Sequence, residues 1–137
     1  MAMSTLPFDW EVVSHSKVLS VIGRDERRMN DGSLRWDEIA FVIGKMAIHL
    51  AVNEDTDEVI VSYAMSPQGD DWLAIASLDF VVGMPLGYCW LNTNSHGYSD
   101  GFTLAFGDIV PEVLEPKLTF LGEASSLCCY KMAPVTG

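Results

Sequence analysis

The chain has 137 residues, a size typical of one domain, and 49% of them are hydrophobic, enough for a core without metal or disulfide support. Only 20% are charged, which argues against intrinsic disorder. The formal net charge is -11 with only 8 Lys and Arg, so neither nucleic acid nor a membrane surface is an expected partner. We expect a single domain over residues 1–137, with a lead-in segment at 1–14 and a core at 15–133.

Alternating apolar and polar residues predict strands along most of the chain. The expected strands are residues 16–23, 38–43, 46–52, 57–64, 86–92, 102–106, 117–121 and 126–132. Residues 24–35 form an expected polar loop, and 111–116 an expected connector. Short loops between the strands at 38–43, 46–52 and 57–64 predict an antiparallel meander.

Trp72 to Val82 is the best helix candidate, since Leu73, Ala76, Leu78 and Phe80 give a loose helical stripe and stop signals follow at Gly83 and Pro85. The elements together predict a mostly β domain of the α+β class. We expect a strongly bent antiparallel sheet of seven to eight strands with one helix over an opening. The sheet is a meander, a sandwich or a partly open barrel.

The three cysteines, Cys89, Cys128 and Cys129, have no disulfide spacing. On a strand, neighbouring residues 128 and 129 point to opposite faces, which opposes both a vicinal disulfide and a shared metal. We expect free, mostly buried thiols in a reducing cytosol. The first ten residues lack a signal-peptide pattern, and no apolar run approaches the ~20 residues of a membrane helix. These features predict a cytoplasmic protein.

The segment W-L-N-T-N-S-H-G-Y-S-D-G, residues 90–101, is the densest cluster of polar and turn-forming residues. One interpretation is a hairpin loop held by Asx turns, with Tyr98 packed back on the sheet. The other is a small ligand site in which Trp90 forms an apolar wall and His96 or Asp100 meets groups from the 24–36 loop. The candidate ligand-binding residues are Trp90, Asn92, Asn94, His96, Tyr98 and Asp100.

An Asp–His pair in this loop could orient an imidazole for acid–base work, but no nucleophile motif accompanies it, so we assign no catalytic residue. Zinc spacings and phosphate-binding loops are absent from the sequence, and we expect neither metal nor cofactor. The acidic turn at 54–58 lacks the pattern of an EF-hand and is interpreted as a solvated hairpin tip. Of the four tryptophans, Trp90 is expected in the core, whereas Trp10 and Trp36 are candidate surface anchors.

Three segments carry a resemblance: D-T-D-E-V-I-V at 55–61, G-Y-C-W-L-N-T-N-S-H-G-Y-S-D at 87–100 and A-S-S-L at 124–127. Over residues 16–132 the chain resembles a family of small, stand-alone bacterial domains of unknown function. The shared W-x-x-x-N-x-x-G-Y-x-D pattern falls on Trp90, Asn94, Gly97, Tyr98 and Asp100. The resemblance implies a soluble bacterial protein and no particular activity.

Two functions remain open. The first is a non-enzymatic protein-interaction module, immunity-type or regulatory, that binds a basic protein or forms a homodimer. The alternative is a small-ligand-binding or enzymatic domain that uses the loop at 92–100. Small size, acidity and abundant aromatic residues favour the first.

Overall fold

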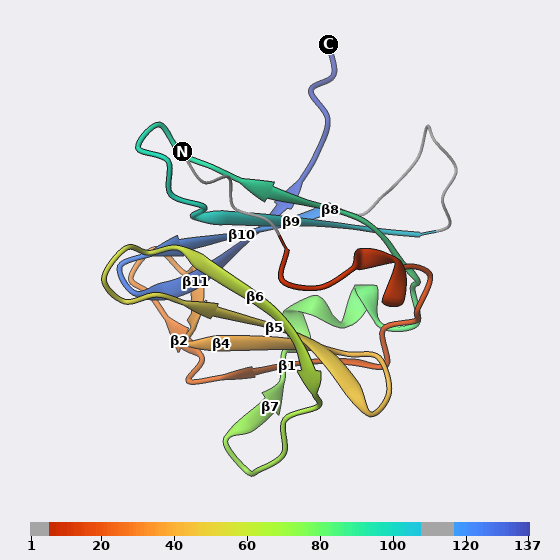
Figure 1. Ribbon diagram of the computed structural model, residues 1–137. Coiled ribbons are helices and arrows are strands. Elements are labelled where there is room, and N and C mark those ends of the chain that lie inside the picture. Colours follow the sequence, from red (N-terminus) through yellow and green to blue (C-terminus); the bar gives the residue numbers. More distant parts are fainter. Residues whose placement is uncertain (1–5, 108–116) are drawn as a thin grey trace.

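Two antiparallel β-sheets face one another in the computed structural model, which describes residues 6–107 and 117–137 (Figure 1). The sheets are separate and are not closed into a barrel. Of the arrangements that the sequence predicted, this is the sandwich. The predicted count of seven to eight strands is too low, because the described residues contain eleven strands. The predicted connector at 111–116 lies outside the described residues.

The five-stranded sheet has the order β6-β5-β4-β1-β7. Its strands are β6 (Val59–Met65), β5 (Met46–Val52), β4 (Glu38–Val42), β1 (Ser20–Arg24) and β7 (Trp72–Ala74). Consecutive strands β4, β5 and β6 pair antiparallel, which confirms the predicted meander.

The six-stranded sheet has the order β2-β3-β11-β10-β9-β8. Its strands are β2 (Arg27–Arg28), β3 (Leu34–Trp36), β11 (Ser126–Met132), β10 (Lys117–Glu123), β9 (Gly101–Phe106) and β8 (Leu86–Asn92). The polar loop predicted at 24–35 is therefore wrong, since it contains the β2–β3 hairpin. Asp31 accepts hydrogen bonds from the Ser33 hydroxyl and N–H at the hairpin tip, and these lower the pKa of Asp31.

The helix predicted over 72–82 is also wrong. Residues 72–74 pair with β1 as β7, and Ala76–Val81 form a 3-10 helix, η2. The buried side chains Ile75, Leu78 and Val81 recur every third residue, which suits the three-residue turn of a 3-10 helix. Leu73 and Phe80, which belonged to the predicted stripe, are exposed.

The core lies between the sheets and is dominated by four fully buried phenylalanines. The ring of Phe41 on β4 packs edge-on against Phe120 on β10 at 5.6 Å and lies 6.0 Å from Phe106 on β9. Replacing one such ring with alanine typically costs about 3–5 kcal/mol, so these contacts hold the sheets together.

The N-terminal segment covers the opening between the edge strands β6 and β8. Phe8 stacks at 5.6 Å on Tyr63 of β6, and the Trp10 indole donates to the Gly87 carbonyl of β8 over 2.8 Å. Trp10 begins the short 3-10 helix η1 (Trp10–Val12) and is half-buried. The N-terminal segment therefore links the two sheet edges, through Phe8 on one side and Trp10 on the other.

Two expectations for tryptophans are reversed. Trp36, a candidate surface anchor, is buried against Gly23 on the facing sheet, where an added Cβ would lie 2.6 Å from its Cδ1 atom. Trp90, expected in the core, is 42% exposed on the outer face of β8. The reason is the strand phase, because Trp90 alternates with the inward-facing Cys89 and Leu91.

Candidate functional site

The polar loop, residues 92–100, is organised by Asn94. Its side-chain oxygen accepts hydrogen bonds from the N–H groups of His96 and Tyr98, at 2.9 and 3.2 Å. The Asn94 N–H in turn donates to the Tyr98 carbonyl, and Gly97 turns the chain with a φ of +87°. Asn94 therefore closes the Asx turn that one interpretation of the sequence expected.

Asp100 has a supporting place in this loop. Its carboxylate accepts a hydrogen bond from the Asn94 amide over 3.2 Å, and its carbonyl accepts from Gly122 on β10. The structure gives His96 and Asp100 no hydrogen bond to one another among the described side chains, so the suggested Asp–His pair is not formed. Tyr98, expected to pack back on the sheet, is 44% exposed.

The ligand-site interpretation also expected the loop to meet residues 24–36. It does not, because β2 and β3 lie at one edge of the six-stranded sheet and β8 lies at the other. Asn92 points instead at the neighbouring strand, where its amide donates to the Thr103 hydroxyl over 2.9 Å. The six candidate residues thus divide between the polar loop, which bonds to itself, and the outer face of the sheet, which carries Trp90 and Asn92.

The outer face of the six-stranded sheet carries a row of side chains set by the strand register. Trp90 lies opposite Thr103, Thr103 opposite Thr119, and Thr119 opposite Tyr130. The two threonine hydroxyls hydrogen-bond at 2.9 Å. The amine of Lys117 lies 5.9 Å from the centre of the Trp90 ring. Aromatic side chains therefore flank a hydroxyl-lined strip.

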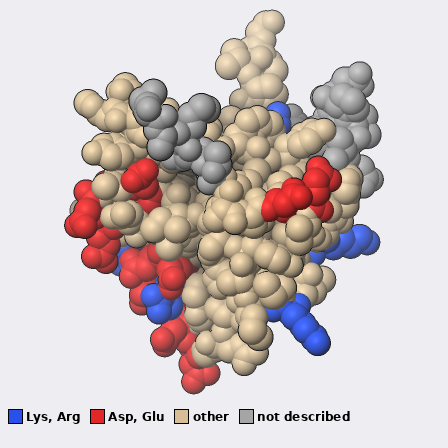
Figure 2. Space-filling view, viewed as in Figure 1, with Lys and Arg blue, Asp and Glu red and all other residues tan. Residues whose placement is uncertain are grey.

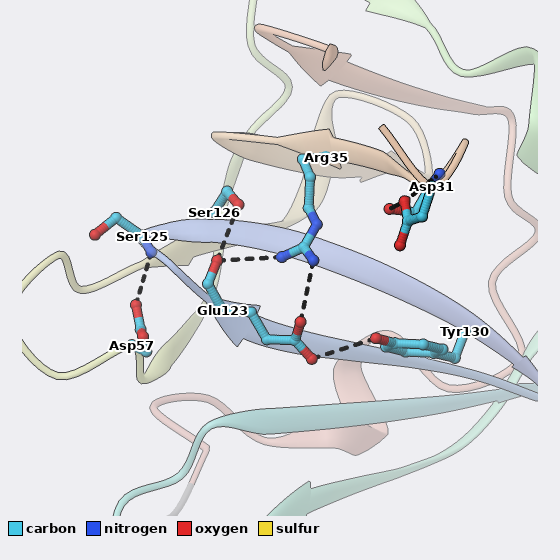
Figure 3. Close-up of polar contacts among 8 residues, drawn as sticks. Asp31, Arg35, Asp57, Glu123, Ser125, Ser126 and Tyr130 are labelled. Atoms are coloured by element: carbon cyan, nitrogen blue, oxygen red, sulfur yellow. Dashed lines mark hydrogen bonds and ion pairs between the residues drawn. The ribbon is translucent and has the colours of Figure 1, made fainter. Parts of the chain in front are cut away.

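The acidic turn, residues 54–58, is not a free hairpin tip. Figure 3 shows the Asp57 carboxylate accepting a hydrogen bond from the N–H of Ser125, at the turn between β10 and β11, over 2.8 Å. The Ser125 hydroxyl donates to the Glu54 carbonyl. Asp57 and Ser125 both adopt positive φ, at 59° and 62°. The prediction of a solvated hairpin tip is therefore wrong for the part of the turn around Asp57, which contacts Ser125.

Glu58 extends the same contact to the polar loop. Its carboxylate accepts from the Ser99 N–H over 3.3 Å, and the Val59 N–H donates to the Ser99 carbonyl over 2.9 Å. Gly122 allows the approach, because a Cβ there would collide with the Asp57 carbonyl oxygen. A glycine inside a strand is the one sequence signal that marks such close backbone approach. The three segments that carried the family resemblance thus meet at one end of the sandwich.

Arg35 on β3 ties the β10–β11 hairpin to its neighbour. Its guanidinium donates to the Glu123 carbonyl and, over 3.1 Å, to the Glu123 carboxylate, which also accepts from the Tyr130 hydroxyl (Figure 3). Hydrogen bonding to the Cys128 thiol, with smaller contributions from desolvation and the Glu123 charge, raises the pKa of Tyr130 to about 12. Tyr130 therefore stays protonated at neutral pH.

The thiols are free, as the sequence predicted, and Cys128 and Cys129 take opposite faces of β11. Burial raises the pKa of Cys89 to about 11, and burial with the neighbouring Cys128 raises that of Cys129 to about 12. A thiolate is the reactive form of cysteine, so neither residue is an activated nucleophile.

Charged side chains are distributed unevenly. Figure 2 shows Asp and Glu gathered along the left flank of the visible face, with a smaller group on the right. Arg24 and Arg27 pair with Glu38 and Asp37, at 2.6 and 2.9 Å. Within residues 6–107 and 117–137, no three His, Cys, Asp or Glu side chains are grouped to hold a metal ion. Nor does this part of the chain contain a helix long and apolar enough to cross a membrane.

Neither a curated protein nor a solved structure matches the chain. A family model does match, and it covers residues 1–136, which include all three segments that meet at the end of the sandwich. The chain belongs to this family, a family of unknown function (DUF6334).

Proposed function

We propose that the protein is a non-enzymatic interaction module that binds another protein chain through the outer face of its six-stranded sheet. The observation that carries this proposal is the exposure of four large side chains on that face. These side chains are 42–48% exposed and lie on β8 and β11, the two strands that flank the threonine strip. They are Tyr88, Trp90, Tyr130 and Met132. Aromatic residues and methionine are enriched at protein interfaces, where a few of them supply most of the binding energy.

The geometry of this face favours a flat partner. Trp90 and Tyr130 stand three strands apart in one row, roughly 14 Å at the usual strand spacing. Between them the Thr103 and Thr119 hydroxyls hydrogen-bond to one another, so a partner can cover the strip without leaving a buried hydroxyl unpaired. A second β-sheet packs on a surface of this kind.

A second copy of this chain is the partner that we propose. The same face on both subunits makes a closed, two-fold contact. Lys117 places a positive charge on this face. The carboxylate of Glu123 on the same face is paired with Arg35 and accepts a hydrogen bond from Tyr130. The carboxylates of Asp37, Glu38 and the acidic turn lie on other elements. Two copies can therefore approach face to face without opposing their main clusters of carboxylates.

The size of the face limits the expected affinity. Four strands about 4.8 Å apart and about six residues long span roughly 400 Å². A stable complex buries about 800 Å² on each partner, so we expect weak self-association with a micromolar or higher Kd.

Sedimentation equilibrium over micromolar to submillimolar concentrations tests the proposal. The wild-type chain should self-associate, and the double variant Tyr88→Ser/Trp90→Ser should remain monomeric. Leu73→Ser is the matched control, because Leu73 is 66% exposed but lies on β7 of the other sheet. A wild-type chain that stays monomeric, or a control that loses association to the same extent, would contradict the proposal.

The alternative, a ligand-binding or enzymatic domain that uses the polar loop, has less support from the geometry. The Asn94 and Asp100 side chains are already bonded within the loop. If the alternative were correct, His96→Ala would abolish the binding of some metabolite while leaving the thermal stability unchanged. A thermal-shift screen of metabolites on both chains makes that measurement.

A further inference from the structure

A second feature of the molecule lies beside η2 (Ala76–Val81). There η2 lies over the inner face of the six-stranded sheet and leaves a cavity of about 290 Å³. Five of its lining side chains are apolar and come from β3, η2 and β10: Leu34, Trp36, Leu78, Phe80 and Leu118. Ligand pockets in proteins are mostly apolar in this way, with a few polar groups that fix the orientation of the ligand.

One cation stands at this cavity. Lys131 on β11 lines it, and the Lys131 amine lies 4.8 Å from the centre of the Phe80 ring on η2. No carboxylate among residues 6–107 and 117–137 forms an ion pair with Lys131. Lys131 therefore offers an exposed cation at the edge of an apolar cavity, in a chain with a net charge of -11.

We propose that this cavity binds a small apolar molecule that carries a carboxylate. The apolar part lies between η2 and the sheet, against Trp36, Leu78 and Leu118. The carboxylate lies at the mouth and pairs with the Lys131 amine. The hydroxyls of Ser33 and Ser77, which also line the cavity, supply further hydrogen-bond donors.

The volume limits the ligand. A cavity of about 150 Å³ lined by aliphatic and aromatic side chains holds one benzene ring. This cavity has about twice that volume but is partly open to solvent, so it suits a two-ring aromatic acid or a medium-chain fatty acid that stays partly exposed.

The remaining polar group does not oppose an anionic ligand. Cys129 lines the cavity, and its thiol stays neutral at physiological pH because burial raises its pKa to about 12. The cavity wall therefore places no thiolate against an incoming carboxylate.

Titration of the full chain with 1-naphthoate, followed by NMR shifts of the backbone amides, tests the proposal. The shifts should concentrate at residues 33–36, 77–80 and 129–131. The neutral isostere 1-naphthamide should bind about fivefold more weakly, the difference expected for a partly exposed ion pair worth up to about 1 kcal/mol.

Variants test the Lys131 cation and the apolar part of the cavity independently. Lys131→Met should weaken naphthoate about fivefold and leave naphthamide unchanged. Ser77→Phe places a ring at the mouth from an exposed position of η2 and should abolish the binding of both molecules. Lys45→Met, which removes a cation from the exposed β4–β5 turn, should change neither affinity.

Three results would overturn the proposal. They are the absence of naphthoate binding at millimolar concentration, shifts that map elsewhere, and equal affinity for naphthoate and naphthamide. A thermal melt of each variant identifies any that fails to fold, and in that case Ser33→Phe, which blocks the same mouth from the β2–β3 hairpin, replaces Ser77→Phe.

Discussion

The acidic turn at 54–58 and the polar loop at 92–100 lie at the same end of the sandwich but use their side chains differently. The turn directs two carboxylates outward, since Asp57 bonds Ser125 and Glu58 bonds Ser99, and only Thr56 bonds within the turn. The loop directs them inward, because Asn94 bonds the N–H groups of His96 and Tyr98. A dense set of polar residues can therefore join distant segments or only shape its own turn.

The turn and the loop should therefore contribute differently to the stability of the sandwich. Bonds from the turn connect β5 and β6 of one sheet to the β10–β11 hairpin of the other. Bonds inside the loop connect residues a few positions apart, whose contacts form without bringing the sheets together. Disrupting the turn should therefore destabilise the whole sandwich more than disrupting the loop.

Gly122→Ala should have the largest effect. The added Cβ would collide with the Asp57 carbonyl oxygen, and backbone cannot move aside as a flexible side chain can. We expect a loss of about 3 kcal/mol in the free energy of unfolding, measured by urea denaturation. Gly101→Ala is the control, because its Cβ would meet the side chains of Asn92 and Leu121 at 3.0 Å, and its loss should be clearly smaller.

Asp57→Ala should have an intermediate effect. It leaves the Ser125 N–H without its acceptor and places alanine at a φ of 59°, so we expect a loss of about 2 kcal/mol. Asp55→Ala in the same turn is the control and should stay within about 0.5 kcal/mol of wild type. Equal melting curves for the two variants would show that the turn is not docked on Ser125.

Asn94→Ala should have the smallest measurable effect, about 1 kcal/mol, because the two freed N–H groups belong to exposed residues that water can reach. His96→Ala should be neutral, since the structure gives its ring no hydrogen bond among the described residues. A loss at Asn94 as large as that at Asp57 would contradict the proposed difference between the loop and the turn.

Local patterns predicted much of the fold. The bounds of β5, β8 and β11 follow from alternation alone, and the meander follows from its short loops. The helix at 72–82 was wrong because its stripe was assigned to Leu73, Ala76, Leu78 and Phe80. The side chains that are buried instead recur every third residue, at Ile75, Leu78 and Val81, as suits a 3-10 helix. The β2–β3 hairpin was missed because its strands are short and rich in arginine.

The candidate site was harder to predict. The Asx turn at Asn94 follows from residue type, since the bonds it makes are local. The docking of Asp57 on Ser125 joins residues 68 positions apart, and no local pattern encodes that pairing. The exposure of Trp90 depends on which face of β8 meets the core, which its neighbours Cys89 and Leu91 decide only once the sheets pack.

The most direct test of the proposed contact face is an NMR concentration series of the four tryptophan indole N–H signals. Trp90 lies on that face, whereas the Trp10 and Trp36 indoles are bonded to Gly87 and Glu26, and Trp72 lies on β7 of the other sheet. The Trp90 signal should move with concentration while the other three stay fixed. A fixed Trp90 signal beside a moving Trp72 signal would place the contact on the five-stranded sheet and contradict the account.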